Sequence, residues 1–287
     1  MASVATFRAH LESSLPERLF STLSWRERAA SLTVSTGVTA LDVLTGGLPR
    51  GALSEITGPP SSGRTGVMLA ALSEATRRQE VCALVDANDS LDPTSAAAAG
   101  VNLERLLWIR CGDMPRRKPD PARALGCLEQ VLKVTDLLLH GGGCGMVVLD
   151  LGDIPFESER RVPLTSWFRF RRAVEPTPTV LLLVEQEPCA GPCASLVVRL
   201  ERRAVCARYS APVLMPNGWR VASGGQRGFP ENNAVSHAAL LSGMQLRAEV
   251  VRCSSSKTKI AHAGDPGWTQ RKPTQSASVN FELRARW

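Results

Sequence analysis

The chain has 287 residues, of which 44% are hydrophobic and 21% are charged, and its formal net charge is +7. This composition is ordinary for a soluble globular protein, and the length suffices for one large or two small domains. No apolar run is long enough to span a bilayer, and residues 1–8 lack the features of a secretory signal, so we expect a cytoplasmic protein that makes no use of a membrane.

The positive charge is compatible with a nucleic-acid partner or an acidic protein partner. The eight cysteines are scattered, and several fall inside expected strands or helices, where cysteine serves as a small core residue. Cys189 and Cys193 have no His or Cys partner at zinc-site spacing. The sequence therefore predicts no metal site built on cysteine.

The first 35 residues carry helical signals, with apolar residues placed among charged ones. Two interpretations stay open for this N-terminal arm. It is either a helix packed on its own domain or a docking arm for another subunit.

The run from Gly58 to Thr65 has the G-x-x-x-x-G-[K]-[ST] spacing of a phosphate-binding loop, with Arg64 in place of the lysine. A buried strand is expected before it, at 52–57, and a helix after it, at 67–75. In that context backbone N–H groups and the helix N-terminus form an anion cradle. The alternative is a glycine-rich turn that binds nothing. We expect nucleotide to bind at Gly58, Pro59, Pro60, Ser61, Ser62, Gly63, Arg64, Thr65 and Gly66, with the Thr65 hydroxyl on Mg²⁺.

Further strands are expected at 81–86, 106–110, 145–150 and 179–184, and a helix at 124–140. The strand at 145–150 ends in Asp150, which is the position of the Mg²⁺-side aspartate of a Walker B strand. Thr65 and Asp150 therefore form the predicted magnesium site.

A further helix is expected at 163–174, with Leu164, Trp167 and Phe168 on one side. Its arginines, Arg169, Arg171 and Arg172, are candidates for contact with single-stranded DNA, with Trp167 and Phe170 nearby for base stacking. The alternative is that the apolar residues pack the helix and the arginines form its solvated face.

Strands alternate with helices through the first two-thirds of the chain, and two later stretches, 246–252 and 279–285, predict antiparallel strands. The fold class is therefore α/β, with a mostly parallel central sheet, helices on both faces and antiparallel strands toward the C-terminus. We divide the chain into an arm (1–35), a nucleotide-binding core (36–252), and a basic loop with a terminal strand that completes the core (253–287). Residues 203–245 are not assigned.

Between about residues 35 and 202 the chain resembles the core of the RecA recombinase family. The resemblance is carried by the stretches 36–42, 46–51 and 86–93 and by the loop from Gly58 to Thr65, which matches the family apart from Pro60 and Arg64. It implies a RecA-like phosphate-loop NTPase fold that uses ATP and Mg²⁺. It also places Gln186 at the family's nucleotide-sensing glutamine.

Three stretches, 48–55, 100–110 and 124–130, are more similar to ImuA-like proteins, the RecA-like accessory factors of bacterial mutagenic repair. That resemblance implies a role in the SOS response and translesion DNA synthesis. The implied partners are RecA and a Y-family-like polymerase subunit.

The chain departs from the RecA pattern where it has Asn88 at the position of the catalytic glutamate, because an amide cannot take a proton from water. The segment 187–195 is also short where RecA has a long DNA-binding loop. These departures favour a non-recombinase accessory factor that uses ATP weakly or as a switch. The alternative is an active RecA-class, ATP-dependent protein that binds single-stranded DNA.

Overall fold

The computed structural model describes residues 33–111, 121–207, 214–215, 218–219, 241–253 and 277–284. Most of the N-terminal arm, most of the stretch 203–245 and the basic loop after residue 253 lie outside the described residues. The elements in chain order are β1 Thr33–Val34, α3 Thr39–Thr45, β2 Leu48–Pro49, β3 Ala52–Thr57, α4 Arg64–Arg77, β4 Cys82–Asp86, α5 Pro93–Ala98, η1 Leu103–Arg105, β5 Leu106–Arg110, α6 Pro121–Gly141, β6 Met146–Asp150, α7 Phe156–Glu159, α8 Leu164–Val174, β7 Val180–Glu185, η2 Gly191–Cys193, β8 Ala194–Ala207, β9 Leu214–Met215, β10 Gly218–Trp219, β11 Leu241–Cys253 and β12 Ser278–Arg284.

The main sheet has eight strands in the order β12-β11-β8-β3-β7-β6-β4-β5. The strands from β8 to β5 run parallel, whereas β11 pairs antiparallel with β8, and β12 pairs antiparallel with β11. The predicted α/β class, with antiparallel strands toward the C-terminus, is confirmed.

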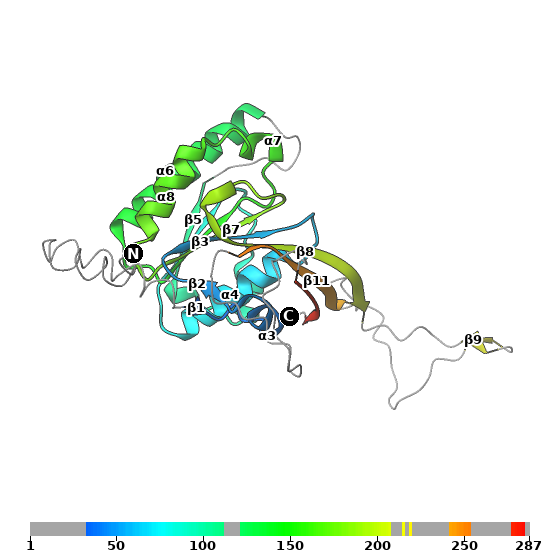
Figure 1. Ribbon diagram of the computed structural model, residues 1–287. Coiled ribbons are helices and arrows are strands. Elements are labelled where there is room, and N and C mark those ends of the chain that lie inside the picture. Colours follow the sequence, from blue (N-terminus) through cyan, green and yellow to red (C-terminus); the bar gives the residue numbers. More distant parts are fainter. Residues whose placement is uncertain are drawn as a thin grey trace, which may run out of the picture.

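Helices cover both faces of this sheet (Figure 1). One face packs against α6 and α8 through a core that includes Leu149, Trp167 and Phe170, and the other packs against α3 and α4 through a core that includes Leu72 and Leu84. The central strands β4, β6 and β7 are buried at every position, as expected for parallel strands covered on both sides.

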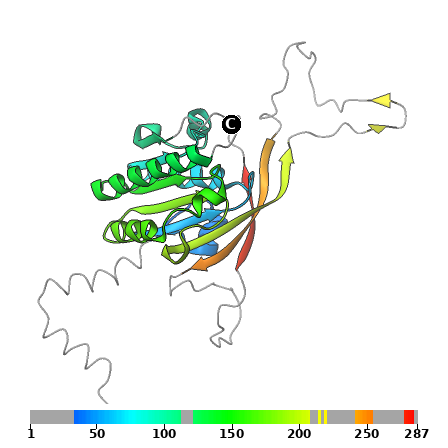
Figure 2. The same ribbon diagram turned by 90° about the horizontal axis from the view of Figure 1, so that it is seen from above.

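Strands β8 and β11 are longer than the other strands of the main sheet and extend beyond the helical layers, as the view from above shows (Figure 2). Beyond the helices the outer residues of β8 become exposed, from Glu201 to Val205. The alternation of apolar and polar residues along this strand weakens after Arg202.

Our prediction of which face of α8 is buried is partly wrong. Trp167, Phe170 and Val174 are buried, whereas Leu164 is 44% exposed and Phe168 is 41% exposed. Spacings of three and four residues put 167, 170 and 174 on one stripe of a helix. Trp167 and Phe170 meet edge to face with ring centroids 5.9 Å apart, so the two rings belong to the core.

Candidate nucleotide site

The loop between β3 and α4 is held in shape by its backbone. The Gly58 amide donates to the Gln186 carbonyl oxygen at 3.0 Å, and the Ser62 amide donates to the Pro59 carbonyl oxygen at 3.1 Å. Gly63 has a φ of +90°, in the region that favours glycine. A side chain at Gly58 would meet the Leu200 carbonyl oxygen. The glycines therefore let this loop pass close to β8 and turn directly into a helix.

Helix α4 begins at Arg64, and Gly63 provides no side-chain cap. The first backbone bond of the helix runs from the Val67 amide to the Gly63 carbonyl oxygen. The amides of Arg64, Thr65 and Gly66 precede that bond, as at every uncapped helix start, and are available to an anion. Among the described residues, the buried Ser62 hydroxyl and the Arg64 Nη1 also lack a hydrogen-bond partner.

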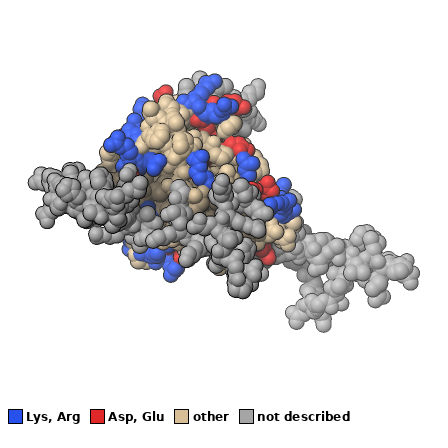
Figure 3. All heavy atoms as spheres, viewed as in Figure 1, with Lys and Arg blue, Asp and Glu red and all other residues tan. Residues whose placement is uncertain are grey.

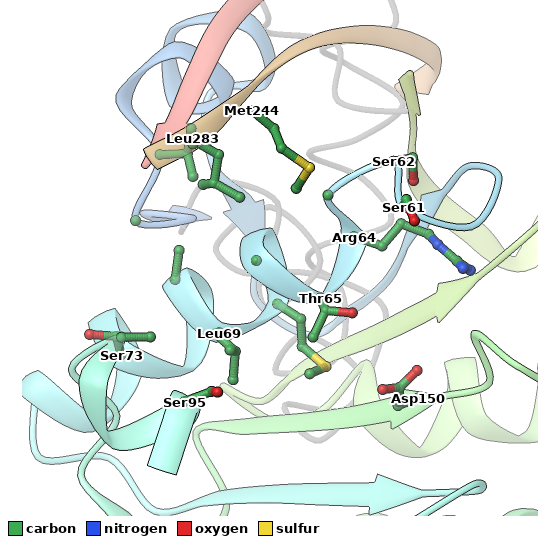
Figure 4. Close-up of a pocket in the computed structure, with 18 of the residues that line it drawn as sticks. Ser61, Ser62, Arg64, Thr65, Leu69, Ser73, Ser95, Asp150, Met244 and Leu283 are labelled. Atoms are coloured by element: carbon green, nitrogen blue, oxygen red, sulfur yellow. The ribbon is translucent and has the colours of Figure 1, made fainter. Parts of the chain in front are cut away.

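A cavity of about 740 Å³ opens in front of this helix start. It is lined by the loop, by α4, by Asp150 and by Met244 and Leu283 from β11 and β12. In Figure 4, Thr65 and Asp150 lie on facing sides of the opening, with Met244 and Leu283 above the start of α4. This volume is in the range of small-molecule and cofactor sites.

Asp150 lies at the end of β6, where parallel strands present their carboxyl ends. Its Oδ1 accepts from the Gly152 amide at 3.0 Å, and the Ser90 hydroxyl is 3.5 Å from its Oδ2. Burial raises the pKa of Asp150 to about 6, and Asp86 and Asp153 add to the rise, whereas Arg64 opposes it. A cation in front of Asp150 would favour its charged form.

The Arg64 guanidinium is 7% exposed and donates from Nη2 to the Gly152 carbonyl oxygen at 3.2 Å. Burial lowers the pKa of Arg64, and four carboxylates, those of Asp150, Asp153, Glu159 and Glu185, oppose that fall. The Gln186 amide nitrogen donates to the same carbonyl at 3.1 Å. Arg64 and Gln186 therefore meet at the loop after β6, although they come from different strand ends.

Asn88 lies in a tight turn after β4 that the carboxylate of Asp86 organises. The two Asp86 oxygens accept from the amides of Asn88, Ser90 and Leu91 and from the Trp108 indole nitrogen, at 2.9 to 3.1 Å. With its lone pairs engaged by these donors, Asp86 is a structural hub. Sequence reasoning missed it, and the signal was a strand-ending Asp followed by the turn residues Asn-Asp-Ser.

No carboxylate replaces the missing glutamate within this turn. The Asn88 side-chain nitrogen is buried and finds no partner among the described residues. Asp89 has a φ of +54° and is paired with Arg110, whose guanidinium lies over the Trp108 ring at 5.1 Å. The turn therefore offers no acidic side chain that is free to act as a base.

The three candidate arginines lie on the outer side of α8. Arg169 donates to Asp136 of α6 at 2.8 Å, and Arg171 and Arg172 are exposed. Figure 3 shows Lys and Arg side chains along the edge where Figure 1 places these two helices. Because Trp167 and Phe170 are buried, the predicted base stacking on them is wrong. The arginines form the solvated face of the helix, apart from the nucleotide cavity.

Part of this chain is similar in sequence to RecA proteins. Residues 19–153 match the family model described as RecA N-terminal domain. Protein RecA of Ectopseudomonas oleovorans is 41% identical over 119 residues, which is 41% of this chain and 30% of the relative. Protein RecA of Methylobacterium sp. (strain 4-46) is 42% identical over 120 residues (41% and 29%), and that of Rickettsia canadensis (strain McKiel) is 29% identical over 200 residues (64% and 54%).

These matches span between 29% and 54% of the length of those curated relatives. Together with the sheet order and the loop geometry they show a RecA-like core. Within the described residues, no helix is long and apolar enough to cross a bilayer.

Proposed function

We propose that this RecA-like chain serves DNA repair as a non-recombinase accessory factor of translesion synthesis, and that it binds ATP with Mg²⁺ as a switch. The proposal rests on a difference between two parts of one site: the groups that would bind nucleotide are present, whereas the described turn after β4 lacks a carboxylate that could serve as the catalytic base. The phosphate loop and Asp150 are present and face one cavity, whereas the turn after β4 holds Asn88 and an Asp89 that is already paired with Arg110.

The retained half of the site fits a magnesium nucleotide. The amides of Arg64, Thr65 and Gly66 at the start of α4 would hold phosphate oxygens. Thr65 and Asp150 would hold Mg²⁺, which supplies charge neutralisation between the phosphates when it is bound. The Gln186 backbone carbonyl accepts from the Gly58 amide of the phosphate loop, and the Gln186 side-chain amide donates to the Gly152 carbonyl oxygen. This position is suited to sensing a ligand bound at the loop.

The implied partners come from the ImuA-like stretches 48–55, 100–110 and 124–130, which resemble accessory factors that work beside RecA and a Y-family-like polymerase subunit. The short segment between Gln186 and β8 supports an accessory role, because only η2 and a few turn residues connect them. The second candidate is an active RecA-class ATPase that binds single-stranded DNA. The loop from Gly58 to Thr65, which departs from the family pattern only at Pro60 and Arg64, and the exposed Arg171 and Arg172 favour it.

Equilibrium binding of a fluorescent ATP analogue, followed by phosphate release with and without single-stranded DNA, tests the proposal. We expect Mg²⁺-dependent binding, negligible release and no stimulation by DNA. Asp150→Asn should weaken binding in Mg²⁺ by about tenfold or more, because the variant loses a charged ligand (roughly 1.5–3 kcal/mol). The neighbouring exposed Asp153→Asn is the matched control and should bind nearly as the wild type does.

Release that DNA stimulates would replace the accessory role with the active RecA-class function. An absence of binding would leave the loop a structural element and would refute the switch. Unchanged affinity of Asp150→Asn in Mg²⁺ would refute the assignment of the magnesium site.

A further inference from the structure

A second group of ionisable side chains lies inside the molecule, behind the phosphate loop. In the parallel pairing of β3 with β7, Glu55 lies opposite Leu183, and Thr57 lies opposite Glu185. Since side chains alternate between faces, Glu55 and Glu185 project to the same side of the sheet as diagonal neighbours. Both are fully buried.

The turn after β7 adds a thiol to this pair. Cys189 Sγ lies 2.6 Å from Glu185 Oε2, and one ligand atom from each of Glu55, Glu185 and Cys189 lies within 4.8 Å of the other two. We call these three residues the Glu–Glu–Cys cluster. Cys189 as a residue is half-buried, whereas both glutamates are fully buried.

Backbone amides fix the carboxylates in place. Glu55 Oε1 accepts from the amides of Ala190 at 2.6 Å and Cys189 at 3.2 Å, and Glu185 Oε1 accepts from the Cys189 amide at 3.3 Å. One oxygen of each glutamate is thereby oriented by the turn, as supporting hydrogen bonds orient metal ligands in proteins. The second oxygen of Glu185 contacts the Cys189 thiol.

The cluster has acceptors without matching donors. Glu55 Oε2 is buried and has no hydrogen-bond partner among the described residues. Glu159 of α7, which is 1% exposed, has no partner for either carboxylate oxygen, and its charge acts on Glu185 and Cys189. Buried carboxyl groups without donors are costly unless a proton or a cation neutralises them. Arg64 and Arg252 are nearby cations, but Arg64 Nη2 already donates to the Gly152 carbonyl oxygen and Arg252 Nη1 donates to the Gly191 carbonyl oxygen.

We propose that the Glu–Glu–Cys cluster binds a borderline divalent cation of the Zn²⁺ class. Zn²⁺ accepts thiolate and carboxylate ligands together, whereas Mg²⁺ and Ca²⁺ select oxygen alone. Glu55, Glu185 and Cys189 supply three ligands. On binding, the Cys189 thiol releases its proton to solvent and coordinates as thiolate. This site is separate from the proposed magnesium site at Thr65 and Asp150.

Co²⁺ titration of the metal-free full-length protein tests the proposal, because a cobalt–thiolate bond gives a charge-transfer absorption band. We expect one equivalent of Co²⁺ to produce the band and Zn²⁺ to displace it. Cys189→Ser should abolish the band. Glu185→Gln should weaken Zn²⁺ binding by more than the tenfold to hundredfold typical of losses outside the ligand set.

Two matched controls separate this site from other thiols and from the nucleotide site. Cys193→Ser changes a buried cysteine outside the cluster and should keep the band, as should Asp150→Asn. A band that survives in Cys189→Ser would overturn the assignment. An absence of any stoichiometric band in the folded wild-type protein would overturn the site itself and does not depend on the folding of a variant.

Discussion

Glu159→Gln should remove a strong pH dependence from the stability of the metal-free protein. Burial is the largest cause that raises the pKa of Glu159, to about 8 from an ordinary 4.5, and Glu55 adds to the rise while Arg64 opposes it. Between these two pH values the native protein keeps the proton, whereas the unfolded chain has released it. Stability therefore falls as the pH rises, by about 1.4 kcal/mol for each pH unit that one such proton governs.

Over the whole interval this single carboxyl accounts for about 5 kcal/mol, and roughly 4 kcal/mol of that falls between pH 5 and pH 8. The glutamine variant has no ionisable proton at this position. Its free energy of unfolding should therefore fall by roughly 4 kcal/mol less than that of the wild type between pH 5 and pH 8. The comparison of slopes is informative even if the glutamine is less stable at every pH, because the amide also lacks a partner.

Urea unfolding in EDTA at intervals from pH 5 to pH 8 measures both slopes. Glu157→Gln, an exposed position in the same short helix, is the matched control and should leave the wild-type slope unchanged. Parallel curves for the wild type and Glu159→Gln would refute the reasoning, because they would mean that the Glu159 carboxyl ionises in the native protein as it does in the unfolded chain.

Two further predictions concern the scaffold. Asp86→Asn should loosen the turn after β4, because an amide cannot accept all of the hydrogen bonds that the carboxylate accepts. Hydrogen exchange of the Ser90 and Leu91 backbone amides should therefore become faster. Unchanged protection of these two amides would contradict the assignment of Asp86 as a structural hub. Trp167→Ala should lower the free energy of unfolding by about 3–5 kcal/mol, since it empties a fully buried position against Phe170. Phe168→Ala, at an exposed position of the same helix, should lower it much less. Equal losses of stability in urea unfolding would contradict the observed buried face of α8.

The parts of the fold that we predicted correctly are those that a short run of contiguous residues determines. The loop from Gly58 to Thr65 specifies strand, turn and helix within a short stretch, and Asp150 ends an apolar run whose length and composition indicate a buried strand. The face of α8 was harder, because Leu164 and Phe168 are apolar and still exposed. Composition alone cannot distinguish such positions from those that the sheet covers.

The carboxylates behind the loop could not have been found from spacing. Glu55 and Glu185 are neighbours only because β7 pairs with β3, and the turn then returns Cys189 to them. Short spacings of cysteine and histidine identify only metal ligands that lie on one turn or one helix. Our expectation of no cysteine-based metal site therefore covered only ligands that are close in the sequence. Strand order, which places residues far apart in the chain side by side, was the missing information.

Arg64 connects the two groups of side chains. A lysine at this position would present a compact ammonium, whereas the guanidinium is longer and carries several donors in one plane. Here one of its nitrogens donates to Gly152 while its charge acts on Asp150 at the nucleotide cavity and on Glu159 and Glu185 behind it. The departure from the phosphate-loop pattern at Arg64 therefore accompanies an excess of buried carboxylates that such a cation partly neutralises. Any ligand that draws the guanidinium toward the cavity would weaken that neutralisation, so occupation of the loop and the charge state of the buried carboxylates are physically linked.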